Sequence, residues 1–83
     1  MAILNITYKG LAADYRLEGD DQLSDADIRR IAAELVRSGG LPGLYIRDLP
    51  HNAFANFVVD RVHGRGETRI YLRPKVPFGQ AVA

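Results

Sequence analysis

One helix is specified at both of its ends by the sequence. Ser24 precedes Asp27 by three residues, the spacing of a capping box in which each side chain satisfies a backbone N–H of the other residue. Apolar residues then recur at the spacing of one buried stripe, namely Ile28, Ile31, Ala32 and Leu35. Gly39 and Gly40 favour a stop, because glycine readily adopts the conformation that ends helices. The sequence therefore predicts a single helix between Ser24 and Gly39, with an apolar stripe that must be covered by something else.

The other segments alternate between apolar and polar residues, which is typical of strands with one buried side. Strands are predicted at residues 3–8, 13–18, 44–48, 54–62 and 68–73. Residues 9–12, "KGLA", are expected to form a hairpin loop, and Pro42 with Gly43 suits the centre of a type II turn. In the last strand the period of two places Thr68, Ile70 and Leu72 on the core side. Arg69, Tyr71 and Arg73 then share the other side.

Length and composition restrict the class of protein. With 83 residues the chain has room for one domain, expected over residues 1–75, followed by a C-terminal tail over 76–83. The absence of cysteine excludes disulfides, thiolate metal sites and thiol catalysis. The N-terminus lacks the basic start and apolar run of a signal peptide, and no segment approaches the ~20 apolar residues of a membrane span. We therefore expect a cytoplasmic protein without a membrane partner.

The order of these elements resembles the β-grasp superfold of ubiquitin-like domains. In that superfold an N-terminal hairpin and the last strand form a mixed sheet, and one helix crosses it. The resemblance covers residues 1–75 and rests on element order and size. It implies an α+β fold in two layers, with a four- to five-stranded mixed sheet, one helix and the order ββαβββ. Ubiquitin-type modifiers end in Gly-Gly, whereas this chain ends in "FGQAVA", so the implied function is that of a non-conjugated interaction domain.

Few residues are suited to catalysis or to metal binding. Both histidines, His51 and His63, fall at predicted turns without a partner at a catalytic spacing. The acidic residues near the helix start do not follow the spacing of a calcium-binding loop. Gly64 and Gly66 lack the lysine and hydroxyl residue of a phosphate-binding loop. We therefore predict no catalytic residues, no metal and no cofactor.

The basic stretch "RVHGRGETRIYLRPK", residues 61–75, supports two hypotheses about function. Tyrosine and arginine are enriched where protein interfaces gain most of their energy. A protein-binding surface is predicted from Arg69, Tyr71, Arg73, Tyr45, Arg47 and the tail residue Phe78. The alternative is a site for RNA or single-stranded DNA, made of Arg61, Arg65, Arg69, Tyr71, Arg73 and Lys75. The isoelectric point of about 8.1 is below the ~9 typical of nucleic-acid-binding domains, which counts against nucleic acid and favours a merely solvated strand face over it.

Charge is distributed unevenly along the chain. Residues 14–27 hold six acidic residues against Arg16, and residues 51–83 hold five basic residues against Asp60 and Glu67. This polarity favours an ordinary solvated surface, with head-to-tail association into a homo-oligomer as the alternative.

Overall fold

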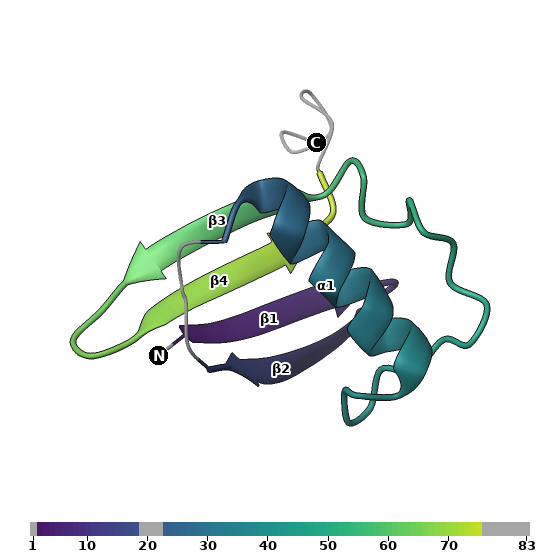
Figure 1. Ribbon diagram of the computed structural model, residues 1–83, viewed down its shortest axis with the longest axis horizontal. Coiled ribbons are helices and arrows are strands. Elements are labelled where there is room, and N and C mark those ends of the chain that lie inside the picture. The colour runs from purple at the N-terminus through teal and green to yellow at the C-terminus, as the bar shows by residue number, and fades with distance from the viewer. Residues whose placement is uncertain (1, 19–22, 76–83) are drawn as a thin grey trace.

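A four-stranded mixed sheet packs one of its faces against a single helix (Figure 1). The computed structural model describes residues 2–18 and 23–75. The elements are β1 (Ala2–Tyr8), β2 (Leu11–Leu17), α1 (Asp25–Ser38), β3 (Val58–His63) and β4 (Thr68–Arg73). The strands lie in the order β2-β1-β4-β3, with β1 parallel to β4 and the other two pairs antiparallel. The predicted α+β class in two layers is confirmed, and the arrangement is compatible with a β-grasp-like fold.

Helix α1 begins and ends as the sequence predicts. Ser24 Oγ accepts a hydrogen bond from the Asp27 N–H at 3.1 Å, and the Ser24 N–H donates to the Asp27 carboxylate at 3.4 Å. At the other end Gly39 has φ of 80°, and the Gly40 N–H donates to the Leu35 carbonyl at 3.0 Å. The helix has 14 residues, and within the described residues no helix combines the length and the apolar character needed to cross a membrane.

The turn between β1 and β2 is shorter than the predicted loop. It contains Lys9 and Gly10 alone, with φ of 50° and 81°, and strand pairing closes on Tyr8 and Leu11. Two positive φ values define a type I′ turn, whose twist matches that of the flanking strands. This turn sets the β1–β2 register, and a shift of one residue would move every side chain of β2 to the other face of the sheet.

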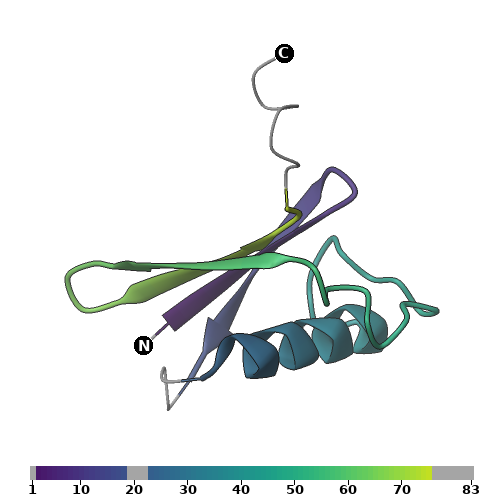
Figure 2. The same ribbon diagram turned by 90° about the horizontal axis from the view of Figure 1, so that it is seen from above.

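The core lies between the sheet and α1. Leu4 and Ile6 from β1, Ile70 and Leu72 from β4, and Ile28 from α1 are fully buried. Figure 2 shows the sheet edge-on, with α1 and the segment that follows it on one side. The other side of the sheet is not covered by any element of the described chain (Figure 2). We call these two sides the covered face and the open face.

The strand expected over residues 44–48 is absent, and this prediction is wrong. Instead the Pro42–Gly43 turn forms as predicted, with Gly43 at φ of 82° and the Leu44 N–H directed to the Leu41 carbonyl at 3.3 Å. The Ile46 N–H then donates to the carbonyl of Val36 at 3.0 Å. The last carbonyls of a helix lack partners within the helix. The segment therefore completes the end of α1 and does not extend the sheet.

The strand expected over residues 54–62 begins at Val58, so its first four residues were assigned wrongly. Turns occupy this part of the chain, and the Phe57 N–H donates to the Phe54 carbonyl at 3.0 Å. In this turn both phenylalanine rings contact Tyr8. The ring centroid of Phe54 lies 5.5 Å from that of Tyr8, and the ring centroid of Phe57 lies 6.0 Å from it. A strand would have sent Phe54 and Phe57 to opposite faces. The burial of Phe54 and the partial burial of Phe57 against Tyr8 therefore explain why the strand starts late.

Candidate functional site: the open face of the sheet

The open face presents three residues from each strand. These are Ile3, Asn5 and Thr7 of β1, Ala12, Asp14 and Arg16 of β2, Val58, Asp60 and Val62 of β3, and Arg69, Tyr71 and Arg73 of β4. Their placement follows from strand alternation, because the neighbours of each in sequence point toward α1. The predicted trio of Arg69, Tyr71 and Arg73 thus does share one face.

Tyr71 lies near the centre of the open face, between its cross-strand neighbours Asn5 and Asp60. The guanidinium of Arg73 lies 5.9 Å from the centre of the Tyr71 ring. Arg73 also forms an ion pair with Asp60, with Nε 3.1 Å from the carboxylate and Nη2 in contact with the same oxygen. Arg73 therefore holds the tyrosine ring in place, and its own charge is already compensated.

Arg69 and Arg16 flank Ile3, which is paired with both of them in the sheet. Neither arginine forms an ion pair with another residue in the described ranges 2–18 and 23–75. On its other side Arg69 is paired with Val62, which is 55% exposed. This end of the open face therefore combines uncompensated positive charge with exposed apolar surface.

Asp14 is the second acidic residue of the open face. The side-chain amide of Asn5 donates to its carboxylate at 2.8 Å. The Thr7 hydroxyl donates in turn to the Asn5 side-chain oxygen at 3.5 Å. The amide leaves the carboxylate its full negative charge, because a hydrogen bond from a neutral donor does not compensate it.

Arg61, a member of the predicted nucleic-acid site, lies on the covered face. Its register partner is the buried Ile70, and its guanidinium donates to the Asp25 carboxylate at 2.5 Å and to the Leu23 carbonyl at 2.6 Å. The expectation that Arg61 joins Arg69 and Arg73 is wrong. Side chains on one face of a strand lie at every second position. Val58, Asp60 and Val62 therefore lie on the open face, and Arg61 lies on the other.

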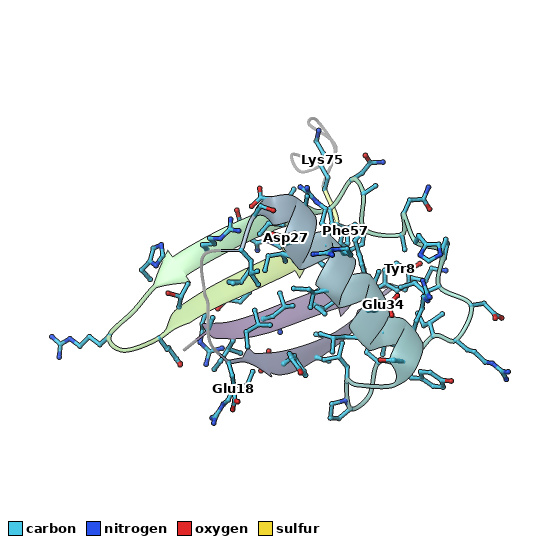
Figure 3. All side chains as sticks on the ribbon, in the orientation of Figure 1. Tyr8, Glu18, Asp27, Glu34, Phe57 and Lys75 are labelled. Carbon is cyan, nitrogen blue, oxygen red and sulfur yellow. The ribbon has the colours of Figure 1, made fainter. Side chains whose placement is uncertain are left out.

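The other two basic residues of that predicted site lie at opposite ends of the β3–β4 hairpin. Arg65 is in the loop closed by the hydrogen bond from the Gly64 N–H to the Glu67 carbonyl, at 2.8 Å. Lys75 follows the far end of β4 (Figure 3). Six residues of strand separate the two ends, or about 20 Å. The structure therefore does not gather the six predicted residues into one surface.

Tyr45 and Arg47 do not lie beside Tyr71. Both belong to the segment that follows α1, on the side of the covered face (Figure 2). Tyr45 is 59% exposed and its ring lies against Gly39, since a Cβ built there would be 3.5 Å from the ring. Phe78, the tail residue of the predicted surface, lies outside the described residues.

A shallow groove lies at the edge of the sheet, between the start of α1 and β3. Phe57, Val58, Val59, Asp25, Arg29, Ala55, Asn56 and Lys75 line it. Figure 3 shows Phe57 and Lys75 near this edge. Arg29 is already engaged there, because its Nε and Nη2 both donate to the Phe57 carbonyl, at 3.1 Å and 3.0 Å. These two hydrogen bonds connect α1 to the residue that precedes β3.

The histidines have local partners. Arg37 donates to His51 Nδ1 at 2.8 Å, and His63 Nδ1 lies 3.1 Å from the Thr68 hydroxyl. In the described part of the chain no three residues of the metal-ligating types come together.

No family model matches the chain, and neither does any curated protein or solved structure. Function therefore has to be argued from the geometry of the open face.

Several residues of this face were not among the predicted site residues, and those nearest Tyr71 and its arginines are Ile3, Val58, Asp60 and Val62. Val58, Asp60 and Val62 alternate along β3, and that signal was present in the sequence. The sequence did not show which residues of another strand these three would adjoin, because that depends on the register of β3 with β4. Alternation along β1 places Ile3 on the side opposite Leu4, but its position between Arg16 and Arg69 follows only from the pairing of β1 with β2 and β4.

Proposed function

We propose that this domain is a non-catalytic binding module that docks a protein partner on the open face of its sheet. The observation that carries the proposal is the surface around Tyr71, which no described element covers. We define the docking patch as Ile3, Val62, Arg69, Tyr71 and Arg73. Tyrosine and arginine are enriched among the residues that contribute most to protein interfaces, and Ile3 and Val62 add apolar surface beside them.

The charges of the docking patch specify the chemistry of the partner. Because Arg73 is paired with Asp60, the uncompensated cation beside Tyr71 is Arg69. A partner that buries this patch must supply a carboxylate opposite Arg69, since a buried guanidinium without a counter-charge is costly. It must also supply apolar side chains against Ile3 and Val62. We therefore propose an acidic protein surface with an apolar centre as the ligand.

The same geometry makes nucleic acid the weaker alternative. Binding of a single strand requires a row of cations along the backbone and several aromatic side chains for stacking. The open face has one aromatic ring, and one of its arginines is paired with Asp60.

The proposal includes a cytoplasmic location. The support for it is that this small domain has no cysteine and so does not depend on disulfides, which form in oxidising compartments.

The experiment places a photo-cross-linking amino acid at position 71 in the cells that make the protein. A matched probe at position 34 reports on the opposite side of the molecule, because Glu34 projects from the exposed side of α1. We expect a defined partner to cross-link through position 71 and not through position 34. Its affinity for the purified domain should fall at least about tenfold in the double variant Arg69→Glu/Tyr71→Ala, and should fall with added salt.

Two results would overturn the proposal. One is an equal yield of the same proteins from positions 71 and 34. The other is tight binding of mixed-sequence RNA or single-stranded DNA, with log affinity falling by about 0.7 per phosphate contact against log salt. The double variant must first be shown to unfold at the same denaturant concentration as the wild type.

A further inference from the structure

Among residues 2–18 and 23–75, the strand β2 forms one edge of the sheet and pairs with β1 alone (Figure 1). In a hairpin with a two-residue turn, the residues that flank the turn are a hydrogen-bonded pair, here Tyr8 and Leu11. Alternation then directs the backbone groups of Ala12, Asp14 and Arg16 away from β1. Seven residues are long for an unprotected edge, and the strand contains neither proline nor lysine, two residues that commonly block pairing.

The sequence of β2 is complementary to itself in one antiparallel register. If Tyr15 faces Tyr15 of a second copy, Asp14 of each copy faces Arg16 of the other. Both residues of that pair have outward backbone groups, so they also form the hydrogen-bonded pairs of the new ladder. Asp14 and Arg16 are exposed and neither has an ion-pair partner in the described chain. Two ion pairs therefore form from charges that are otherwise uncompensated.

Other registers lack this complementarity. The register centred on Ala13 sets Asp14 against Ala12 and leaves Arg16 beyond the partner strand. The register centred on Asp14 places two carboxylates opposite each other, which is unfavourable between neighbouring strands. At the other edge, β3 offers no better solution, because Asp60 and Arg61 are adjacent in sequence and no symmetric antiparallel register sets one opposite the other. Charge thus selects both the edge and the register.

We propose that two copies of this chain associate through β2 in the register centred on Tyr15. The two sheets join into one of eight strands, with both α1 helices on one side and both open faces on the other. At the non-hydrogen-bonded position the two Tyr15 side chains lie close together, an arrangement that favours aromatic pairs. The dimer doubles the open face into a continuous surface, so that a partner with two acidic segments binds with avidity.

The test uses two charge reversals, Asp14→Arg and Arg16→Asp, examined by sedimentation over a range of concentrations. Wild type should dimerise reversibly. Each single variant should dimerise at least about tenfold more weakly, because two ion pairs become two like-charge pairs. An equimolar mixture of the two single variants should form a heterodimer, and the double variant Asp14→Arg/Arg16→Asp should recover the dimer, since both restore opposite charges.

Arg69→Asp is the matched control, because it reverses a charge on the open face away from β2 and should leave the dimer unchanged. The proposal is overturned if wild type stays monomeric at the highest concentration, or if the mixed variants fail to associate. It is also overturned if Asp14→Ala strengthens association, which would indicate the register centred on Asp14. The assay contains no partner protein, so its outcome is independent of the docking patch and of the function proposed for it.

Discussion

The two faces of the sheet use the same strands for different purposes. Along β4, Ile70 and Leu72 are fully buried against α1, whereas Arg69 and Arg73, one residue away, are exposed. The covered face packs aliphatic side chains against α1, and the stability of the protein depends on how completely these side chains fill the core. The open face carries a tyrosine, arginines and carboxylates that the fold does not need for packing. Under the proposed function, the open face is therefore where substitutions should change binding without changing the fold.

Arginine shows the same contrast. Arg61 on the covered face donates to Asp25 and to the Leu23 carbonyl, and thereby joins β3 to the residues that begin α1. Arg69 on the open face has no ion-pair partner within the described residues. The first is part of the scaffold, and the second is available to a ligand.

The largest expected difference between the two faces is between two adjacent residues of β4. Ile70→Ala removes a fully buried side chain and should lower the free energy of unfolding by about 2–5 kcal/mol. Tyr71→Ala should lower it by about 1 kcal/mol or less, since the ring lies on the open face. Urea unfolding of both variants measures the difference. Equal losses would show that the open face also supports the fold.

Truncating the two arginines tests the comparison for charged residues. We expect Arg61→Ala to cost about 1–2 kcal/mol, because it removes two hydrogen bonds from a partly buried guanidinium and frees the start of α1. Arg69→Ala should change stability by less than about 0.5 kcal/mol. The melting temperatures of the two variants provide the measurement. A larger loss for Arg69→Ala would contradict the roles assigned here.

The helix cap satisfies a backbone N–H group at the start of α1, and its loss should have a smaller effect. Ser24→Ala should cost about 1 kcal/mol, because the Asp27 N–H loses its acceptor. Ser24→Asn is the control, since asparagine caps equally well. Chemical unfolding of the three proteins at pH 7 gives the comparison. An equal loss in both variants would mean that capping is not the role of Ser24.

The cap also makes stability depend on pH. Hydrogen bonding to the side chain and backbone N–H of Ser24, with a smaller effect of Arg30, holds the pKa of Asp27 below its ordinary value of 3.8. A lowered pKa in the folded state stabilises the protein above pH 3.8, and this contribution is lost as the pH falls through the lowered pKa. The stability difference between wild type and Asp27→Asn should therefore shrink between pH 5 and the acid limit of folding. A difference independent of pH would contradict this assignment.

The smallest predicted effect concerns the turn that sets the faces of β2. Lys9 has φ of 50°, a conformation that costs energy for most side chains but that asparagine tolerates. Lys9→Asn should therefore stabilise the domain by about 0.5 kcal/mol without changing its fold. Lys9→Val, which cannot easily adopt positive φ, should destabilise it. Stabilisation by valine would show that the turn is not of type I′.

The sequence predicted what local patterns determine. The α1 caps, the Pro42–Gly43 turn and the division of β4 between two faces were all correct. The errors fall where tertiary contacts override the local pattern. Residues 44–48 satisfy a carbonyl of α1, and Phe54 and Phe57 pack on Tyr8, neither of which alternation reveals. For the docking patch, Tyr71 and its arginines were found. Ile3 and Val62 required the sheet order, because they adjoin Arg69 through pairing between strands that are distant in sequence.

In the proposed division of roles, the open face binds a protein partner and the covered face stabilises the fold. This division is tested most directly by measuring two quantities on Arg69→Glu/Tyr71→Ala, namely the affinity for the partner captured through position 71 and the free energy of unfolding. We predict that affinity falls at least about tenfold while the free energy of unfolding changes by less than about 1.5 kcal/mol. Unchanged affinity in a folded double variant would contradict the claim.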